Sequence, residues 1–496
     1  MDLNEETIKL ILGLKIKQSR LDRNITLSEL AEKSGISISY LTEIEKGKKQ
    51  PKPSKVAAIA EALGLTYDWL VSLQLNKRMA PIGELIKSNM LKELPLSHFG
   101  LDVPRLIDLF ATAPTKLAAF INTLIEISRS HDLKVEQFYF SALRSYQEMH
   151  ENYFKDLEEA VEKFNDLFGL DPNQTPTDTD LEKILTNEFK VNVLDLDTIK
   201  YPELKSLRTV YKPSDNPTLY INPSLSPSQR AFALGRELGF AFLKITKRPL
   251  TSSWIKIISF DEVLNNFEAS YFSGALLINR DRLVNDIAGF FRQTEWSGEK
   301  WGQMALKYNA SPEMFLHRLT SILPKFFNIN HLFFLRFNNI PGTKEFKLSK
   351  ELHLSGLHNP HANFNSEHYC RRWVSLTIMD ELKTQVQNGK YTTPVTQIQF
   401  SDYADSDNKY VVISMARPMN PSPDSLCSVS LGIKFSENFA DKIKFLKSAN
   451  LPRRTVSETC ERCPIKDCES RAAEDFILQQ KLNQRKMINK LEDLLN

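Results

Sequence analysis

The first seventy-five residues carry the pattern that most constrains the fold, a series of five short helical stripes separated by turn signals. Thr26 and Glu29 have capping-box spacing, in which the hydroxyl accepts from the amide three residues on and the carboxylate accepts from the cap amide. A second helix begins there and ends near Gly35, whose freedom at positive φ permits a sharp turn. A third helix over residues 37–46 follows, so we expect a helix-turn-helix.

The third helix and the residues after it form a candidate DNA-binding surface. Leu41 and Ile44 point inward, and the outer face carries Ser37, Ser39, Tyr40, Thr42 and Glu43. Five lysines then fall within ten residues, at Lys46, Lys48, Lys49, Lys52 and Lys55. This density suits contacts with DNA phosphates, and a solvated face is the alternative. Because the net charge is only +3, DNA binding must come from such a local patch.

The run SGISISYLTEIEKGKKQPKPSKVAAIAEALG resembles the XRE or Cro/CI-type repressors over the whole of residues 1–75. The resemblance implies a five-helix domain that binds double-stranded DNA as a homodimer at paired half-sites. A helical connector is expected over residues 76–170, with prolines dividing its first half into shorter helices. One long helix is expected over residues 135–168, packed within its own chain or, as a minority interpretation, against a second protomer.

The stretch from Ser226 to Lys244 decides between a hydrolase and a sensor. A zinc peptidase helix carries His-Glu-x-x-His, which presents two imidazoles to the metal and a Glu to the attacking water. Here that frame holds Arg236, Glu237 and Phe240, and neither a guanidinium nor a benzene ring binds zinc. An ordinary buried amphipathic helix is the alternative interpretation. Without a metal, Glu237 has no activated water to act on, so we expect no enzyme activity; a regulatory peptidase is the less favoured alternative.

The downstream run FEASYFSGALLIN resembles the second helix of ImmA/IrrE-type metallopeptidases, and Glu268 is the carboxylate nearest to their third ligand. Residues 171–330 therefore resemble such a domain without its metal. We expect Arg236 to replace the charge of the ion and to pair with Glu268. Surface or salt-bridged carboxylates at positions 237 and 268 are the alternative.

Alternating apolar and polar residues predict strands in the second half of the chain. Two short strand regions are expected within 189–196 and 209–221, and four more at 331–337, 393–400, 409–416 and 426–435. The predicted fold class is mostly α with α+β parts: an N-terminal five-helix domain, a helical connector, a zincin-like α/β domain and a C-terminal α/β sensor domain over residues 331–496.

Three cysteines crowd into nine residues near the C-terminus, at Cys460, Cys463 and Cys468. Thiolates at this spacing can hold one metal centre, and Cys370 is the expected fourth ligand, with His368 as a substitute. A 4Fe–4S cluster is preferred over zinc or free thiols. Cys427 lies in an apolar run and is expected to be buried and inert. A further group of histidines, at positions 353, 358, 361 and 368, is expected in a polar loop.

The helix-turn-helix, the IrrE-like segment, the Cys370-Arg371-Arg372-Trp373 run and the cysteine-rich close together resemble the short-chain fatty acyl transcriptional regulator family. The resemblance implies a dimeric transcription factor that responds to a short-chain acyl-CoA or related metabolite, with an iron–sulfur cluster possible. Relatives often carry a cysteine after a Leu-Gly pair, whereas this chain has Ile433. A redox-sensing iron–sulfur transcription factor is the alternative.

The chain shows no apolar run long enough to span a membrane and no secretory signal, so a cytoplasmic location without membrane contact is expected. The last helix, over residues 475–495, has leucine and isoleucine positions at irregular spacing. We expect it to dock on the domain or to support a dimer.

Overall fold

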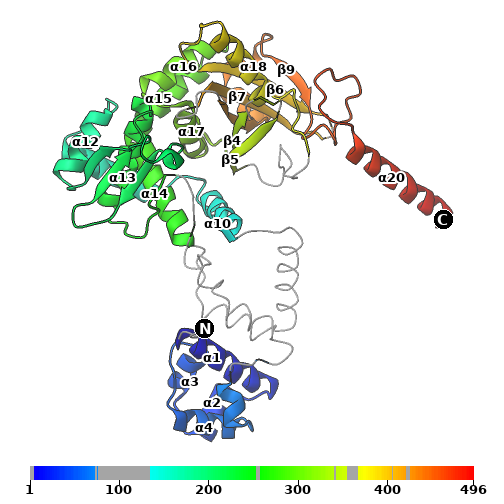
Figure 1. Ribbon diagram of the computed structural model, residues 1–496. Helices are drawn as coiled ribbons and strands as arrows, with labels where there is room; N and C mark the ends of the chain where they lie inside the picture. Colours follow the sequence, from blue (N-terminus) through cyan, green and yellow to red (C-terminus); the bar gives the residue numbers. More distant parts are fainter. Residues whose placement is uncertain are drawn as a thin grey trace. The chain divides into compact units, whose positions relative to one another are not determined.

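The computed structural model describes residues 5–72, 75, 135–252, 257, 259–339, 342–343, 345–354, 367–404, 406–419 and 425–495 (Figure 1). The chain forms two compact units, which are described separately. Residues 1–146 and 258–261 make one unit, and residues 147–257 and 262–496 make the other. The predicted helices of residues 81–134 lie outside the described residues.

The N-terminal domain has the five expected helices, α1 (Glu5–Asp22), α2 (Leu27–Ser34), α3 (Ile38–Glu45), α4 (Pro53–Ala62) and α5 (Tyr67–Val71). The capping box is present, since the Glu29 amide donates to Thr26 Oγ1 (3.2 Å) and the Thr26 amide donates to the Glu29 carboxylate (2.7 Å). Gly35 ends α2 at φ +65°, as its position predicted. Leu30, Leu41 and Ile44 lie in one apolar core between the helices.

The single long helix predicted over residues 135–168 is wrong. Two helices occupy this range, α10 (Val135–Met149) and α11 (Lys155–Phe168). Between them Glu151 and Asn152 both adopt φ +51°, which no α-helix tolerates. The Asn152 side chain is fully buried and its amide donates to Thr320 Oγ1 (2.7 Å), so a tertiary hydrogen bond holds the break.

The IrrE-like region places a small sheet beside a group of helices. Strands β1 (Asn192–Asp195), β2 (Thr209–Lys212) and β3 (Thr218–Ile221) lie in the order β1-β3-β2, with β1 parallel and β2 antiparallel to β3. The helices are α12 (Asp178–Asn187), α13 (Pro227–Phe242), α14 (Phe260–Leu277), α15 (Arg280–Phe291), α16 (Gly298–Lys307) and α17 (Pro312–Phe327). A Cβ on Gly235 would lie 2.6 Å from Ser273 Oγ, so the glycine lets α13 approach α14 closely.

The C-terminal region is a six-stranded sheet in the order β5-β4-β8-β7-β6-β9, antiparallel except between β6 and β9. The strands are β4 (Leu332–Asn339), β5 (Phe346–His353), β6 (Val395–Tyr403), β7 (Lys409–Pro418), β8 (Leu426–Lys434) and β9 (Arg453–Val456). Helix α18 (Val374–Gln387) covers one face, and α17 packs against β4 and β8. The chain continues through α19 (Glu437–Lys442) and ends in α20 (Phe476–Leu495).

The four strands predicted here are confirmed, whereas β5, β9 and α18 were not predicted. His353 lies in β5 and not in the expected polar loop, and the positions 358 and 361 lie outside the described residues. The architecture is therefore mixed α/β, with strands concentrated in the C-terminal half of the chain.

Candidate DNA-binding face and two candidate ligand sites

Helix α3 exposes its N-terminal residues to solvent. Ser37 caps it by accepting from the Tyr40 amide (3.4 Å), and both Ser37 and Ser39 are exposed. Tyr40, Thr42 and Glu43 are half-buried. The Thr42 hydroxyl donates to the Ile38 carbonyl (2.8 Å), and Lys55 Nζ lies 4.3 Å from the Tyr40 ring centroid. The first turn of α3, which also exposes 48% of Ile38, is therefore the part free to contact bases.

Two contacts that the sequence did not reveal hold α3 against α1. Arg20 binds the Glu45 carboxylate through two hydrogen bonds of 2.7 and 2.8 Å, and both side chains are buried. A Cβ on Gly13 would lie 2.4 Å from the Ile44 carbonyl oxygen, so only glycine permits this approach of the backbones. These contacts fix the direction of α3 relative to the rest of its domain.

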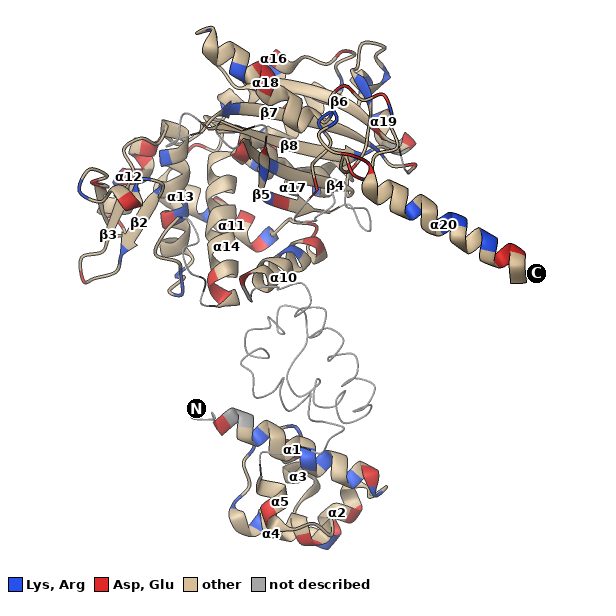
Figure 2. Cartoon of the chain, turned by 45° about the vertical axis from the view of Figure 1, so that its right-hand side comes forward, with Lys and Arg blue, Asp and Glu red and all other residues tan. Residues whose placement is uncertain are grey.

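The lysines expected to contact phosphates lie at the end of α3 and after it. Lys48, Lys49, Lys52 and Lys55 are exposed, and Lys46 is half-buried. Figure 2 shows the blue segments of this domain, which the lysines and arginines supply. An exposed cationic loop beside an exposed helix N-terminus can contact DNA phosphates while α3 lies in the major groove.

The zincin-like frame on α13 is filled by charged and aromatic side chains. Arg236 is buried and donates from Nη2 to Thr209 Oγ1 (3.1 Å) and from Nη1 to Asn266 Oδ1 (3.4 Å). Its ion pair is with the adjacent Glu237, at 3.5 Å. Burial is the main influence on this guanidinium and lowers its pKa.

The expected pair between Arg236 and Glu268 does not form. On α14 it is Asn266 that reaches Arg236, and Glu268 lies two residues on, about 200° around the helix. Burial raises the pKa of the Glu268 carboxyl. The presence of Arg236 in place of a histidine and of a carboxylate at Glu268 therefore did not predict which residue contacts Arg236.

Arg248 is the residue that sequence reasoning missed at this site. Its guanidinium hydrogen-bonds to the Glu237 carboxylate, and it lies 4.0 Å from the Phe240 ring centroid and 3.9 Å from that of Tyr211. Glu237 is thus held between two arginines. The position of the second zinc ligand is covered by a cation stacked on an aromatic ring.

A second cationic cluster lies where α17 meets the C-terminal sheet. Glu313 on α17 pairs with Arg336 Nη1 (3.2 Å) and Lys350 Nζ (3.4 Å). The charges of Arg336 and Arg208 both act on Glu313 and on Arg417, whose own Nη1 donates to the Pro418 carbonyl (3.0 Å). Burial lowers the pKa of Arg417.

The cationic cluster is defined as Arg208, Arg336, Lys350 and Arg417: Arg336 and Lys350 pair directly with Glu313, and the charges of Arg208 and Arg417 also interact with it. Cys427, expected to be buried and inert, is buried within it and its sulfur accepts from Arg336 Nε (3.3 Å). Lys350 is exposed, and the three arginines are half-buried. An excess of positive charge at half-buried side chains favours an anionic ligand.

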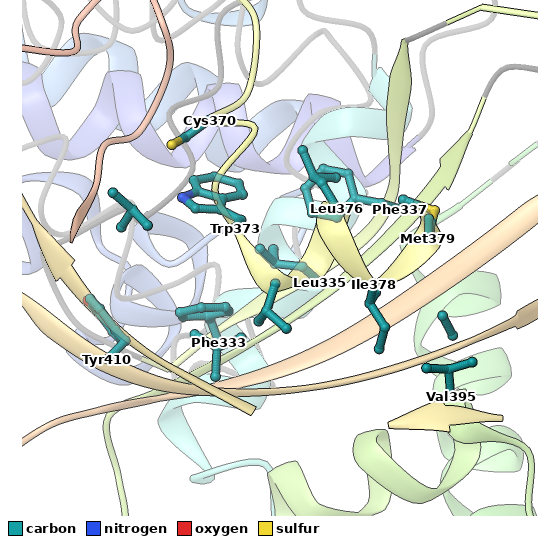
Figure 3. Close-up of a cluster of buried hydrophobic side chains, with 14 of the residues drawn as sticks. Phe333, Leu335, Phe337, Cys370, Trp373, Leu376, Ile378, Met379, Val395 and Tyr410 are labelled. Atoms are coloured by element: carbon teal, nitrogen blue, oxygen red, sulfur yellow. The ribbon is translucent and has the colours of Figure 1, made fainter. Parts of the chain in front are cut away.

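The cysteine-rich segment folds against the chain around Cys370. Tyr369 bridges Thr459, the Cys370 amide donates to the Glu458 carbonyl (3.3 Å), and the Cys460 amide donates to the His368 carbonyl (2.8 Å). Figure 3 shows Cys370 beside Trp373 at the margin of the core under α18. His368, considered as a substitute ligand, has its Nδ1 2.7 Å from the Glu461 carboxylate.

The four thiols lie in one region that we call the cysteine region, formed by Cys370, Cys460, Cys463 and Cys468. Cys370, Cys460 and Cys463 are buried, and burial raises the pKa of Cys370 to about 11, with Cys460 and Cys463 adding to the rise. Backbone amides donate to three sulfurs: Ala472 to Cys460 (3.3 Å), Ile465 to Cys463, and Ser457 and Arg372 to Cys370.

The amide donors oppose the effect of burial on Cys370 and Cys463, but the pKa of each thiol remains raised. Across the described part of the chain, no three His, Cys, Asp or Glu side chains are arranged closely enough to hold a metal ion. Ile433 stands where relatives carry a cysteine, and it pairs with Leu332 of β4. The adjacent Gly432 lies against the ring of Phe333, which belongs to the apolar core that also contains Cys370. Because successive residues of a strand point to opposite faces of the sheet, Ile433 faces away from the cysteine region.

Comparison with known proteins assigns two parts of the chain. Residues 16–70 match the helix-turn-helix family, and residues 186–320 match the IrrE N-terminal-like domain. The chain carries a helix-turn-helix domain and an IrrE-like domain. Together these two matches cover less than half of the chain. Separately, within the described residues no helix is long and apolar enough to cross a bilayer.

Similar proteins are regulators by name. The immunity repressor of Bacillus phage phi105 is 40% identical over 60 residues, which is 12% of this chain and 42% of the repressor. The Mycobacterium tuberculosis transcriptional regulator ClgR is 32% identical over 73 residues, 15% of this chain and 64% of ClgR. The Bacillus subtilis repressor RghR is 37% identical over 60 residues, 12% of this chain and 44% of RghR. The alignments thus span less than two thirds of each relative.

A solved structure titled "Mycobacterium tuberculosis transcriptional regulator" is also similar, with a TM-score of 0.46 and 17% identity, over 67% of this chain and 93% of that one.

Proposed function

We propose that this protein is a sequence-specific, DNA-binding transcriptional regulator, and that its C-terminal half responds to a short-chain acyl-CoA or related metabolite. The observation that carries DNA binding is the capped, exposed first turn of α3 followed by exposed lysines, in a domain similar to those of named repressors. The buried Arg20–Glu45 pair holds that helix in place for the major groove.

DNA binding is tested by gel retardation of promoter fragments over a range of salt concentrations. The Lys48→Glu/Lys49→Glu variant should bind more weakly than the natural chain, and its salt slope should be smaller by about 1 for each lysine–phosphate interaction that the substitutions remove. Lys383→Glu, an exposed charge reversal on α18, is the matched control and should not change binding. Failure of the natural chain to retard any promoter fragment at low ionic strength would overturn the proposal.

The cationic cluster supports an anionic ligand such as an acyl-CoA. Its arginines can bind phosphate oxygens with two hydrogen bonds each, and only Glu313 offsets their charge within the cluster. An acyl-CoA carries several phosphate charges on one molecule.

Isothermal titration with propionyl-CoA and acetyl-CoA tests this part. Arg417→Gln should weaken binding by at least tenfold, since a charge-assisted hydrogen bond contributes about 1.5–3 kcal/mol. Arg453→Gln, an exposed arginine on β9, should leave binding unchanged. Equal affinities of the two variants would exclude the cluster as the ligand site.

A redox-sensing centre in the cysteine region is the second candidate function. Three of its sulfurs accept backbone hydrogen bonds, which supports a 4Fe–4S cluster or zinc at Cys370, Cys460, Cys463 and Cys468. The thiols would have to move closer together to share a metal, because they do not form a closed site here. Iron, sulfide and zinc analysis of Cys463→Ser against Cys427→Ser tests this candidate. Loss of metal in the first variant alone would support a metal centre in the cysteine region.

Peptidase activity is not part of the proposal. Arg236 and Phe240 supply no zinc ligand, and the Glu237 carboxylate is engaged by Arg248 and Arg236. Both guanidinium groups compete with any water molecule for the oxygens of this carboxylate. Peptide cleavage that is lost specifically in Glu237→Gln would contradict this assignment.

A further inference from the structure

Strand β2 lies at the edge of its small sheet, and a segment of the same chain covers that edge. The sheet order β1-β3-β2 leaves one side of β2 without another strand of the sheet. Residues 247–252, which we call the strap, lie antiparallel to this side through a bridge between Val210 and Thr251. Backbone hydrogen bonds of 2.7 and 3.1 Å flank the bridge. The strap is therefore bound as an extended peptide binds to the edge of a sheet.

Both ends of the strap are held by further hydrogen bonds. At one end, Ser252 Oγ accepts from the amides of Arg208 and Thr209, at 3.0 Å each. At the other end, the Lys247 carbonyl accepts from Asn265 Nδ2 on α14 (2.7 Å). The strap thus connects the edge of the sheet to α14.

The strap also enters the zincin-like frame on α13. In a zinc peptidase the Glu of His-Glu-x-x-His acts on the water that attacks the peptide, so a bound peptide must pass close to this residue. Glu237 holds that position here, and its side chain is 1% exposed. Arg248 of the strap hydrogen-bonds to Glu237 and stacks on Tyr211 and Phe240. The strap therefore lies where a bound peptide would lie.

The balance of charge at this frame favours exchange of the strap. Two guanidinium groups, from Arg236 and Arg248, share the one carboxylate of Glu237. Within the described residues, the Nε atoms of both arginines are buried without a hydrogen-bond acceptor. Without the strap, Arg236 and Glu237 would remain as a balanced pair. The strap thus adds a second cation to a pair that is already neutral, and this repulsion lowers the cost of its displacement.

We propose that the IrrE-like domain is a peptide-binding domain whose edge strand β2 is occupied by its own strap, and that an extended peptide with an arginine can replace the strap. The backbone of the peptide pairs with β2 as the strap does, and its arginine binds Glu237 and stacks on Tyr211 and Phe240. The peptide is bound and not cleaved. This inference goes beyond the proposed function, because it assigns a protein segment as the partner of an edge that neither DNA nor an acyl-CoA uses.

A labelled peptide with the sequence of residues 246–252, Thr-Lys-Arg-Pro-Leu-Thr-Ser, tests the exchange by fluorescence anisotropy with the full chain. Arg248→Ala removes the contact of the strap with Glu237 and keeps the Arg236 pair, so this variant should bind the peptide at least tenfold more tightly than the natural chain does. Lys183→Ala, which removes an exposed charge on α12, is the matched control and should bind like the natural chain. A peptide with Glu in place of its Arg should bind at least tenfold more weakly to Arg248→Ala.

Hydrogen exchange shows whether Arg248→Ala opens the strap or unfolds the domain. The Ser252 amide, which donates to the Thr209 carbonyl (3.1 Å), should exchange at least tenfold faster in this variant, whereas the amides of α13 should keep their protection. If α13 loses its protection, Ser252→Ala replaces this variant in both measurements, because it removes only the hydroxyl at one end of the strap.

Three results would overturn the proposal: an unchanged exchange rate at the strap, an opened strap that binds no peptide, or equal peptide affinities of the natural chain and the opened variant. Because these measurements contain no DNA or acyl-CoA, their failure is distinguishable from failure of the proposed function.

Discussion

Helix α17 takes part in two charge clusters that differ in balance. Near its middle, Arg318 binds Glu158 of α11 through hydrogen bonds of 2.6 and 2.9 Å, and the Tyr271 hydroxyl donates to the same carboxylate (2.7 Å). Five residues earlier, Glu313 lies among the four cations of the cationic cluster. The first cluster has one cation for one carboxylate, and the second has three cations in excess.

This difference in charge balance distinguishes an ion pair that stabilises the fold from a group of charges that suits a ligand. A balanced, fully hydrogen-bonded pair joins α11 to α17 and needs nothing more. An unbalanced cluster keeps cations close together at the expense of stability, which a protein tolerates where a ligand supplies the missing charge. Removing one member should therefore lower the stability of the protein much more in the balanced cluster than in the unbalanced one.

The largest loss of stability is expected when the balanced pair of Arg318 and Glu158 is broken. Glu158→Ala leaves the Arg318 guanidinium, 3% exposed, without its carboxylate, and should lower the free energy of unfolding by about 3–5 kcal/mol. Denaturant unfolding followed by circular dichroism measures it. Glu159→Ala, the adjacent and half-exposed carboxylate, should cost less than about 1 kcal/mol. Similar losses in both variants would show that the pair is not what joins the helices.

A loss of stability of intermediate size is expected from the protonation of His317, which lies between the two clusters on α17. Burial and the charge of Lys350 lower its pKa to about 3 from an ordinary value of 6.5. The unfolded chain then binds the extra proton first, so stability falls as pH falls from 6.5 toward 3, by about 1.4 kcal/mol per pH unit.

Unfolding is measured at pH 6.5 and 5, because the carboxylates with lowered pKa lose their contribution only below about 4.5. The natural chain is compared with His317→Phe, since the half-buried Glu268, whose pKa is raised, is present in both. His317→Phe keeps an aromatic ring against Phe334 and should flatten the pH dependence. An unchanged slope in that variant would show that another group titrates.

Much of the fold was readable from local patterns. The capping box at Thr26, the helix that starts after Ser226 and the alternating strands β6, β7 and β8 all appear where the sequence predicted them. The break in the helix at Asn152 was not readable, because no proline or glycine marks it and a distant threonine holds it. Strand β5 was not predicted because its polar residues are those of a sheet edge.

The sites were less predictable than the elements. The frame at Arg236 and Phe240 was read from spacing along one helix, but its real partner, Arg248, comes from the segment after that helix. Arg208, Glu313 and Arg417 are separated by about a hundred residues each, and only the packed fold brings them together. Spacing within one element is visible in a sequence, whereas charge balance between elements is not.

The smallest change in stability is expected from the unbalanced cluster, and it is the sharpest test of the comparison. Arg417→Gln removes one of four cations and leaves Glu313 with its partners Arg336 and Lys350. The relief of repulsion offsets the reduced packing, so the free energy of unfolding should change by less than about 1 kcal/mol, in either direction. Phosphate or acyl-CoA should stabilise the natural chain more than this variant. If Arg417→Gln lowered the free energy of unfolding as much as Glu158→Ala, Arg417 would be needed for the fold. The two clusters would then differ in the number of cations but not in their role.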